Sequence, residues 1–325
     1  MSKKSKEIFN AFLDEASEIC ILGHISPDGD CVGSVLSIKN YINTVYPEKR
    51  ADVYLEEKPH KFEYLSGYDS IITDCAVQKS YDLCIVCDCG SADRLGKFLK
   101  YLKAAKKSFL VDHHVTNQGF CNEFVIEPEA SSTSEIVFTL LSEEYIKTAV
   151  AECIYTGIIH DTGVFKYNTT SSRTMEIAGK CMDKGIAYSS IIDDSFYAMS
   201  FDVRRLLGYT LTHLEARLSG RFNIAVLSTK EMREFGIMNS RETDGFIESI
   251  RNITGAAGGA FFYQIPDGHY KASLRSNTDS LDVAQIALSL GGGGHKRAAG
   301  CLLSENYRAD IEKIVEMVRE QLDKE

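Results

Sequence analysis

Histidines and aspartates occur together in four short segments of the first half of this sequence, each at the end of a hydrophobic run. The segments are His24-Ile25-Ser26-Pro27-Asp28-Gly29-Asp30, Asp88-Cys89-Gly90, Asp112-His113-His114 and Asp161-Thr162-Gly163. Carboxylates crowded into one place repel one another unless cations lie among them. Mixed imidazole and carboxylate ligands suit Mn²⁺, Fe²⁺ or Co²⁺, and this many ligands exceed the needs of one tetrahedral ion. We therefore expect two divalent metal ions that share a bridging carboxylate.

A simpler interpretation exists for each segment alone. Aspartate and glycine are common turn residues after a strand, so a single Asp-Gly pair would carry no information. The conjunction of Asp-His-His with His-x-x-x-Asp-x-Asp, both at predicted strand ends, favours a metal site over a set of turns.

The predicted secondary structure would bring these segments together. Strands are expected at 20–23, 52–55, 81–88 and 107–111, with helices at 7–18, 31–46, 134–141 and 149–160. Strands that alternate with helices favour βαβ units and a parallel sheet, hence an α/β fold. Ligands of open α/β sheets bind beyond the carboxyl ends of the strands, so the four segments should converge in one crevice.

A chain of 325 residues favours two domains. We expect a first domain over 1–188, a helical connector over 189–215 and a smaller α/β domain over 216–325. The last would contain strands at 222–227, 259–264 and 269–276 and helices at 245–253, 283–290 and 307–322.

Ten cysteines are scattered through apolar runs, which favours buried free thiols in a reducing compartment over disulfides. Cys84 and Cys87 would point to opposite faces of one strand, so a zinc site there is not expected.

The formal net charge of −10 favours a small phosphorylated substrate over long nucleic acid, whose binding depends on lysine and arginine. No apolar stretch is long enough for a membrane helix, and the N-terminus lacks the pattern of a secretory signal. We expect a cytoplasmic protein with no membrane partner.

The sequence resembles a known family through these segments and through a glycine-rich run in its second half. His24 with Asp28-x-Asp30, Asp88, Asp112-His113-His114 and Asp161 match the four motifs of the DHH phosphoesterase superfamily, and the run 291–300 looks like the glycine-rich motif of the accompanying DHHA1 domain. Length and pairing resemble the nano-RNase and pAp-phosphatase branch, which hydrolyses RNAs of a few nucleotides and dephosphorylates 3′-phosphoadenosine 5′-phosphate (pAp). His160 departs from the family, whose members carry a small polar residue there.

The resemblance implies a Rossmann-like, mainly parallel sheet followed by a helical connector and a smaller mixed-sheet domain. It also implies two metal sites that share Asp88. One would be held by His24, Asp28 and Asp88, the other by Asp30, Asp88, His113 and Asp161. Mn²⁺ is the favoured ion, with Mg²⁺ and Co²⁺ as alternatives.

The expected catalytic residues are His114, Asp88 and Asp112. A water activated by both metal ions would attack phosphorus, and His114 would stabilise the developing charge or protonate the leaving group. Asp112 would orient a histidine.

The second domain is expected to bind the substrate. Four consecutive glycines allow close approach of a phosphate, although a flexible turn is the simpler interpretation. An exposed strand arginine is usually solvated surface, but the family match makes Arg275 a candidate phosphate clamp. The expected substrate-binding residues are Arg275, Ser276, Gly293, Gly294, His295 and, in the first domain, Arg94.

Several other functions stay open on the sequence. A RecJ-like single-strand exonuclease is one alternative, and a phosphodiesterase of cyclic or linear dinucleotides (c-di-AMP, pApA), which shares both domains, is another. A family II pyrophosphatase shares the first-domain motifs but has a different second domain, so the segment 291–295 counts against it. A nucleotide-binding regulator without catalysis is a further alternative. The nano-RNase and pAp-phosphatase hypothesis implies short RNA oligonucleotides and small nucleotides as substrates. The sequence leaves open whether the protein forms a homodimer.

Overall fold

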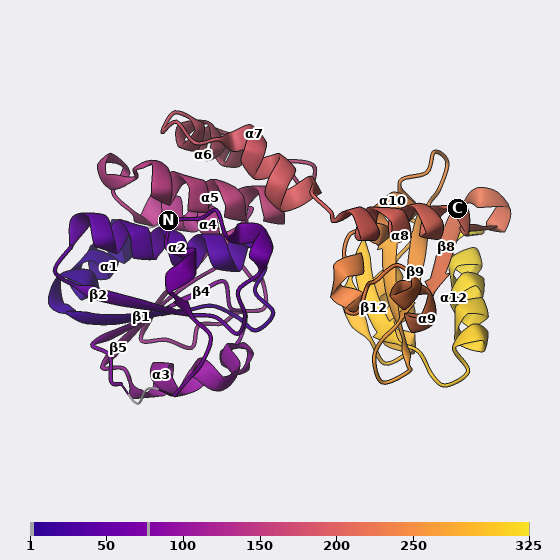
Figure 1. The fold of residues 1–325 in the computed structure, drawn as a ribbon, viewed down its shortest axis with the longest axis horizontal. Coiled ribbons are helices and arrows are strands. Elements are labelled where there is room, and N and C mark those ends of the chain that lie inside the picture. The colour runs from indigo at the N-terminus through magenta and orange to yellow at the C-terminus, as the bar shows by residue number, and fades with distance from the viewer. Residues whose placement is uncertain (1–2, 77–78, 325) are drawn as a thin grey trace. The chain divides into compact units, whose positions relative to one another are not determined.

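The computed structural model describes residues 3–76 and 79–324. The chain divides into two compact units, residues 1–198 and 199–325, which are drawn in Figure 1. Each unit has its own sheet and its own hydrophobic cores. The functional division at 188 and 216 stays a prediction.

The first unit is built from alternating strands and helices. Its strands are β1 (Glu18–Leu22), β2 (Arg50–Tyr54), β3 (Ile71–Ile72), β4 (Leu83–Cys87), β5 (Lys107–Asp112) and β6 (Glu123–Ile126). Its α-helices are α1 (Lys3–Glu15), α2 (Gly29–Val45), α3 (Leu99–Ala104), α4 (Thr133–Leu140), α5 (Thr148–Asp161), α6 (Ser172–Met182) and α7 (Tyr188–Ile191).

All strand pairs of this sheet are parallel, in the order β3-β2-β1-β4-β5-β6. The predicted parallel α/β sheet is therefore confirmed. The chain runs outward from β1 through β2 to β3 and then returns to place β4 on the other side of β1. This reversal is a topological switch point, where open α/β sheets form their ligand sites.

Both faces of the first sheet are buried. Ile85 and Cys87 of β4 belong to the core under α2, α4 and α5, whereas Cys84 and Val86 belong to the opposite core beside α3. Figure 1 shows α2, α4 and α5 on one side of the strands and α3 on the other. Cys84 and Cys87 thus point to opposite faces, as predicted, and all ten cysteines are free.

The second unit contains a mixed sheet, as predicted. It begins with α8 (Phe201–Thr212), and its other helices are α9 (Thr229–Glu234), α10 (Phe246–Arg251), α11 (Val283–Ser289) and α12 (Tyr307–Leu322). The strands are β7 (Glu215–Arg217), β8 (Phe222–Leu227), β9 (Gly258–Gln264), β10 (Tyr270–Ser276), β11 (Gly293–His295) and β12 (Ala298–Leu302). Their order is β11-β12-β10-β9-β8-β7, and only β8 and β9 are parallel.

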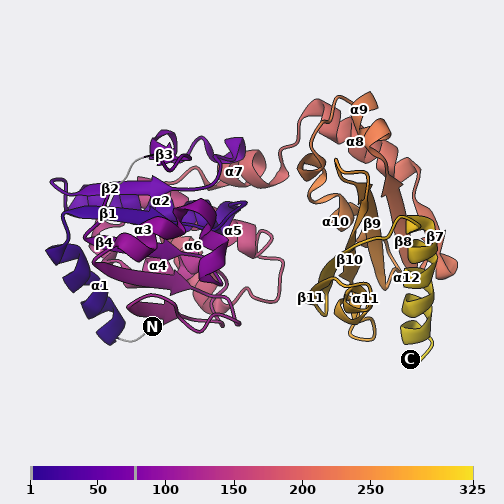
Figure 2. The same ribbon diagram turned by 90° about the horizontal axis from the view of Figure 1, so that it is seen from below.

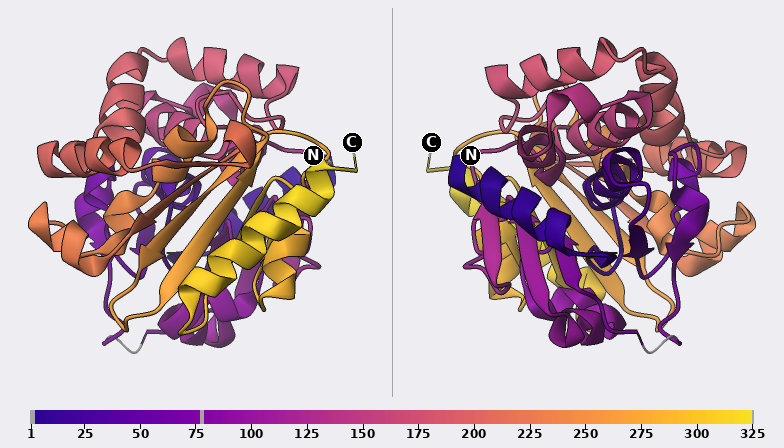
Figure 3. Two further views of the ribbon diagram at one scale, coloured as in Figure 1. Left: turned by 90° about the vertical axis from the view of Figure 1, so that its right-hand side faces the viewer. Right: turned by 90° about the vertical axis from the view of Figure 1, so that its left-hand side faces the viewer.

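Helices cover both faces of this second sheet. One core joins α11 and α12 to Phe222, Phe262 and Leu274, and the other joins α8, α9 and α10 to Leu227 and Phe261. Figure 2 shows the two sets of helices on opposite sides of the strands, and in the left view of Figure 3 the yellow helix α12 crosses one face.

Several short elements were not predicted. They are β3, β6, β7, β11, β12, α3, α6 and α9. The helix predicted at 7–18 instead spans Lys3–Glu15, because the amides of Ser17 and Glu18 donate to the Asp82 carboxylate and start β1 there. The connector region contains α7, a π-helical turn at Ile192–Tyr197, and α8. Among the described residues, no helix has the length and apolar character needed to span a membrane.

Close contact between α2 and α5 depends on Gly33. A Cβ at this position would lie 2.4 Å from the carbonyl oxygen of Cys153 and 2.9 Å from the amide nitrogen of Gly157. Both are backbone atoms and cannot rotate away. The first turns of α2 and the end of α5 carry Asp30 and Asp161, so this contact also positions the candidate site.

We expect Gly33→Ala to destabilise the protein by about 1–3 kcal/mol or more, because it overpacks the α2–α5 contact. Gly179 of α6 is the matched control, since a Cβ there would meet nothing within 4 Å. Gly179→Ala should raise stability by up to about 1 kcal/mol through helix propensity. Thermal and urea unfolding measure both effects, and equal stabilities would contradict the close-packing argument.

Candidate metal centre

The register of three neighbouring strands places the predicted donors in one row. Cys20 pairs with Cys84 and Leu22 with Val86 in β1 and β4, and Cys87 pairs with Val111 in β4 and β5. His24 follows β1, Asp88 follows β4, and His113 follows β5. These three side chains therefore emerge side by side at the carboxyl edge of the sheet, at the switch point.

Asp88 lies at the centre of this row and is 2% exposed. Its Oδ2 is 3.4 Å from Nε2 of His24, and its Oδ1 is 3.7 Å from Nε2 of His113. Oδ1 also accepts a hydrogen bond from the Thr133 hydroxyl at 3.1 Å. Each carboxylate oxygen thus faces a different imidazole, the arrangement that a bridging ligand needs.

The backbone of Asp88 adopts φ 53°, in the left-handed region that costs a non-glycine residue about 1–3 kcal/mol. The amide of Asp88 still donates to the Val111 carbonyl, so the strain begins just as the strand pairing ends. This conformation directs the carboxylate towards the histidines.

His24 is buried and presents Nε2 to Asp88. Its Nδ1 lies 2.7 Å from the Ile25 carbonyl oxygen and 3.2 Å from Nη2 of Arg94. A carbonyl can only accept, so Nδ1 carries the proton and donates to Ile25, and the Arg94 guanidinium is a close neighbour rather than a donor to this nitrogen. This tautomer leaves the Nε2 lone pair available to a metal ion.

Two helix N-termini hold the other aspartates of the first motif. Asp28 caps α2, and its Oδ1 accepts from the amides of Asp30 and Cys31, both at 3.1 Å. Its Oδ2 lies 3.8 Å from Nε2 of His24. Asp30 accepts from the first two amides of α4, Thr133 at 2.6 Å and Ser134 at 2.9 Å. Amides at a helix N-terminus stabilise negative charge.

Asp161, the last residue of α5, completes the set. Its Oδ2 lies 3.1 Å from Nε2 of His113. Burial raises the pKa of Asp161 to about 6. Burial alone would lower the pKa of His113, but its contact with Asp161 and the charge of Asp30 raise it to about 10. The contact between these two groups thus favours the charged form of His113 in the metal-free site.

Asp112 and His114 form a second, adjacent pair. Oδ1 of Asp112 is 2.8 Å from Nδ1 of His114. Oδ2 of Asp112 accepts a hydrogen bond from the side-chain amide of Asn117 at 2.6 Å. The hydrogen bond to Asp112 raises the pKa of His114. The expectation that Asp112 orients a histidine thus applies to His114, whose Nε2 stays free of this bond.

The donor set suits divalent cations. Asp30 is fully buried, and burial together with the charges of Asp88 and Asp161 raises its pKa well above the usual range. Among the described residues, the ion-pair partners of Asp28, Asp88 and Asp161 are histidines. Asp30 and Asp88 are buried, whereas Asp28 is exposed and Asp161 is partly buried. Buried carboxylates are normally paired or bound to metal, and all six predicted metal ligands meet in this one place.

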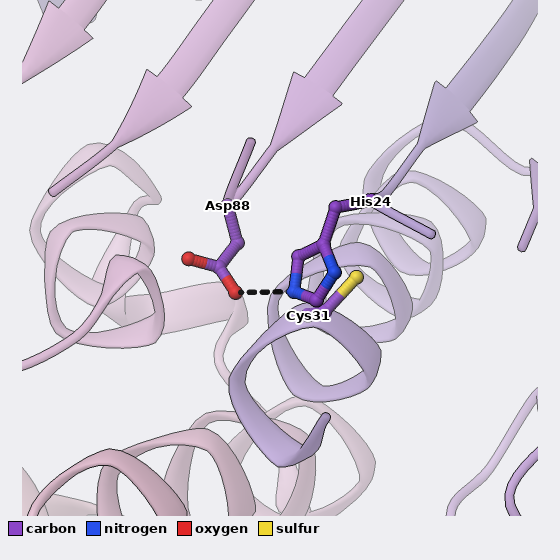
Figure 4. A group of neighbouring side chains, drawn as sticks. All are labelled: His24, Cys31 and Asp88. Carbon is purple, nitrogen blue, oxygen red and sulfur yellow. Dashed lines mark ion pairs between the residues drawn. The ribbon is translucent and has the colours of Figure 1, made fainter. Parts of the chain in front are cut away.

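Three residues near the centre were not predicted as part of it. They are Thr133, Asn117 and Cys31, whose sulfur lies within 4.8 Å of donor atoms of both His24 and Asp88. Figure 4 shows the side chains of His24, Cys31 and Asp88 together. The sequence Ser132-Thr133-Ser134-Glu135 before an apolar run is a helix-start signal that could have identified Thr133.

The predicted substrate-binding residues of the second unit have mixed surroundings. Nε of Arg275 lies 3.6 Å from Oε1 of Glu248. The Ser276 hydroxyl is buried and donates to the Thr278 carbonyl at 2.8 Å. Gly293, Gly294 and His295 form the exposed edge strand β11.

The glycine run does not form one continuous anion-binding nest. The amides of Gly291 (φ 78°) and Gly292 donate to the carbonyls of Leu288 and Ala287. This is the pattern of a Schellman motif, which ends α11. Only the exposed half of the run, Gly293 to His295, stays a candidate for substrate contact.

Comparisons with known proteins identify related domains and chains. Residues 18–158 match the model of the DHH family, N-terminal domain, and residues 223–324 match that of the DHHA1 domain. A Streptococcus mutans protein named probable bifunctional oligoribonuclease and PAP phosphatase NrnA is 30% identical over 87% of this chain and 88% of its own length. The Bacillus subtilis bifunctional oligoribonuclease and PAP phosphatase NrnA is 25% identical over 90% and 92%.

A solved structure is also similar. The crystal structure of an exopolyphosphatase-related protein from Bacteroides fragilis matches with a TM-score of 0.89 and 25% identity, over 99% of this chain and 98% of that one.

We expect Mn²⁺ to raise the unfolding temperature of chelator-treated protein, because binding to the native state alone contributes about 2.7 kcal/mol per site at 100 times Kd. Asp88→Asn should lose most of this rise. The exposed Asp69 is the control, and Asp69→Asn should keep the rise. Differential scanning calorimetry with and without Mn²⁺ measures it, and a full rise in Asp88→Asn would remove Asp88 from the ligand set.

Proposed function

The chain belongs to the DHH family, and from this premise we propose that it is a metal-dependent hydrolase of short oligoribonucleotides that also converts pAp to AMP. Metal dependence is general in the family. The relatives named for oligoribonuclease and PAP phosphatase activity match it over most of their length. The observation that carries the proposal is the position of Asp88, whose two oxygens face His24 and His113.

Two divalent ions would be held by His24, Asp28, Asp30, Asp88, His113 and Asp161, with Asp88 between them. The donors are mixed imidazole and carboxylate, which supports Mn²⁺, with Mg²⁺ and Co²⁺ as alternatives. When bound, such ions supply a water nucleophile at neutral pH and neutralise charge on the phosphate.

The residues beside the metal ligands would act on the substrate. His114, hydrogen-bonded to Asp112 through Nδ1, would direct Nε2 to a phosphate oxygen or the leaving group. Asn117 fixes the other oxygen of Asp112. Arg94, whose guanidinium lies beside His24, would contact a substrate phosphate.

The second unit would bind the substrate through Arg275 and the exposed strand from Gly293 to His295, with Ser276 supporting the loop after β10. The net charge of −10 disfavours long nucleic acid, and thus a RecJ-like activity. A cytoplasmic location and a homodimer also stay predictions, and light scattering would measure the latter.

The direct test is a substrate panel of pAp, pApA, short RNA, long single-stranded RNA, c-di-AMP and pyrophosphate, each with Mn²⁺ and with Mg²⁺. We expect AMP from pAp and pApA, slower hydrolysis of long RNA, and no turnover after chelation. Preference for c-di-AMP would replace the proposal by a cyclic dinucleotide phosphodiesterase. Inactivity on every substrate with metal bound would favour the alternative of a nucleotide-binding regulator without catalysis.

We expect His114→Ala to lower kcat by about 10²- to 10⁴-fold, the usual contribution of a positioned acid or base. The Mn²⁺-dependent rise in unfolding temperature should persist, because His114 is not among the proposed ligands. His60 is exposed and outside the site, so His60→Ala serves as the control with unchanged kcat. Loss of the Mn²⁺ effect in His114→Ala would show instead that this histidine is a ligand.

Arg275→Gln should raise KM for pAp by about 10- to 150-fold, which corresponds to a charged hydrogen bond of about 1.5–3 kcal/mol. Arg233 on α9 is exposed and serves as the control, so Arg233→Gln should leave KM unchanged. Steady-state kinetics of phosphate release measure both. An unchanged KM in Arg275→Gln would exclude the phosphate clamp.

A further inference from the structure

Cys31 is placed as a metal ligand would be. It lies in the first turn of α2, three residues after Asp28, and is fully buried. Its Sγ, a donor nitrogen of His24 and a carboxylate oxygen of Asp88 all lie within 4.8 Å of one another. His24 and Asp88 are themselves 4% and 2% exposed. Figure 4 shows the sulfur beside the imidazole ring, on the helix that faces the strand ends.

The local backbone fixes this position. The Cys31 amide donates to Oδ1 of Asp28 at 3.1 Å, so the cysteine cannot leave the helix start without breaking the cap. The absence of a side chain at Gly23 provides the space for the sulfur, because a Cβ there would lie 2.3 Å from Sγ. The sulfur is therefore held against the segment that carries His24.

We propose that Cys31 is a thiolate ligand of the ion held by His24 and Asp88, which gives this subsite nitrogen, oxygen and sulfur donors. The inference rests on the proposed metal-dependent function and deepens it. On binding, the sulfur donates an electron pair to the ion and its proton passes to solvent. No atom changes oxidation state.

The donor set has a consequence for ion choice. Thiolates favour Zn²⁺ and Co²⁺ over Mn²⁺ and Mg²⁺. With Asp28, whose Oδ2 is 3.8 Å from Nε2 of His24, the subsite has four protein donors, and a five-coordinate ion would keep one position for the water nucleophile. The other subsite, with Asp30, His113 and Asp161, has only nitrogen and oxygen donors. The two subsites should therefore differ in preference, with the thiophilic ion at Cys31.

The alternative role of Cys31 is packing. Leu55 and Val35 also lie next to the space above Gly23, and a buried cysteine often acts as a small apolar residue. Packing alone would need no contact between sulfur and metal, so spectroscopy separates the two roles.

The test is a Co²⁺ titration of chelator-treated full-length protein in a phosphine reductant, which adds no competing thiol. We expect a near-ultraviolet sulfur-to-cobalt charge-transfer band together with visible d–d bands. Cys31→Ser and Cys31→Ala should lose the charge-transfer band, keep the d–d bands and bind Co²⁺ about 10- to 100-fold more weakly, as metal sites do when even a supporting group is removed. The buried Cys181 of α6 is the control, and Cys181→Ser should keep the band.

The outcomes separate this inference from the proposed function. Co²⁺ binding with d–d bands but no charge-transfer band in the wild type would overturn the role of Cys31 and leave the proposed function intact. No Co²⁺ binding at all would remove the metal centre itself. If the Cys31 variants do not fold, X-ray absorption of the wild-type Zn²⁺ protein decides. A sulfur neighbour at about 2.3 Å supports the ligand, and a shell of only nitrogen and oxygen overturns it.

Discussion

The central constraint on this protein is the burial of several carboxylates in one small volume. Two like charges 4 Å apart repel by about 4 kcal/mol at an effective dielectric constant of 20. In the metal-free chain this repulsion is offset by His113 and by the N-termini of α2 and α4, which donate amides to Asp28 and Asp30. The sheet register and the α2–α5 contact then serve one purpose, which is to hold these charges close enough to bind cations.

Much of the fold could be predicted because its long elements carry their own signal. The predicted bounds of 307–322 are those of α12, whose apolar residues recur at helical spacing. Strand β4 is a continuous apolar run, and β5 has an apolar centre from Phe109 to Val111, as expected for a sheet buried on both faces. The two-residue β3 and the exposed β11 could not be predicted, because they exist only through pairing with β2 and β12. The left-handed backbone conformation of Asp88 could not be predicted either, because its residue type does not indicate it.

The predicted donors of the site were brought together because strand ends and motifs fixed their places along the chain. The supporting residues were missed for a different reason. Thr133 and Asn117 act through hydrogen bonds to Asp88 and Asp112 that depend on the packing of α4 and the loop after β5. Cys31 lies in an apolar stretch and looked like any other core thiol. Only its distance from His24 and Asp88 distinguishes it from the other buried cysteines.

The surroundings of Arg275 also bear on its proposed role. Its neighbour Glu248 lies 3.6 Å away, but Glu248 makes a shorter contact with Arg251, at 2.7 Å. Partly exposed ion pairs contribute only about 0–1 kcal/mol. An arriving phosphate would therefore displace Glu248 from Arg275 at little cost, since Glu248 would retain Arg251 and the phosphate would gain a bidentate donor. A guanidinium that shares its carboxylate partner with a second arginine loses less on binding a dianionic ligand than a guanidinium with a carboxylate of its own.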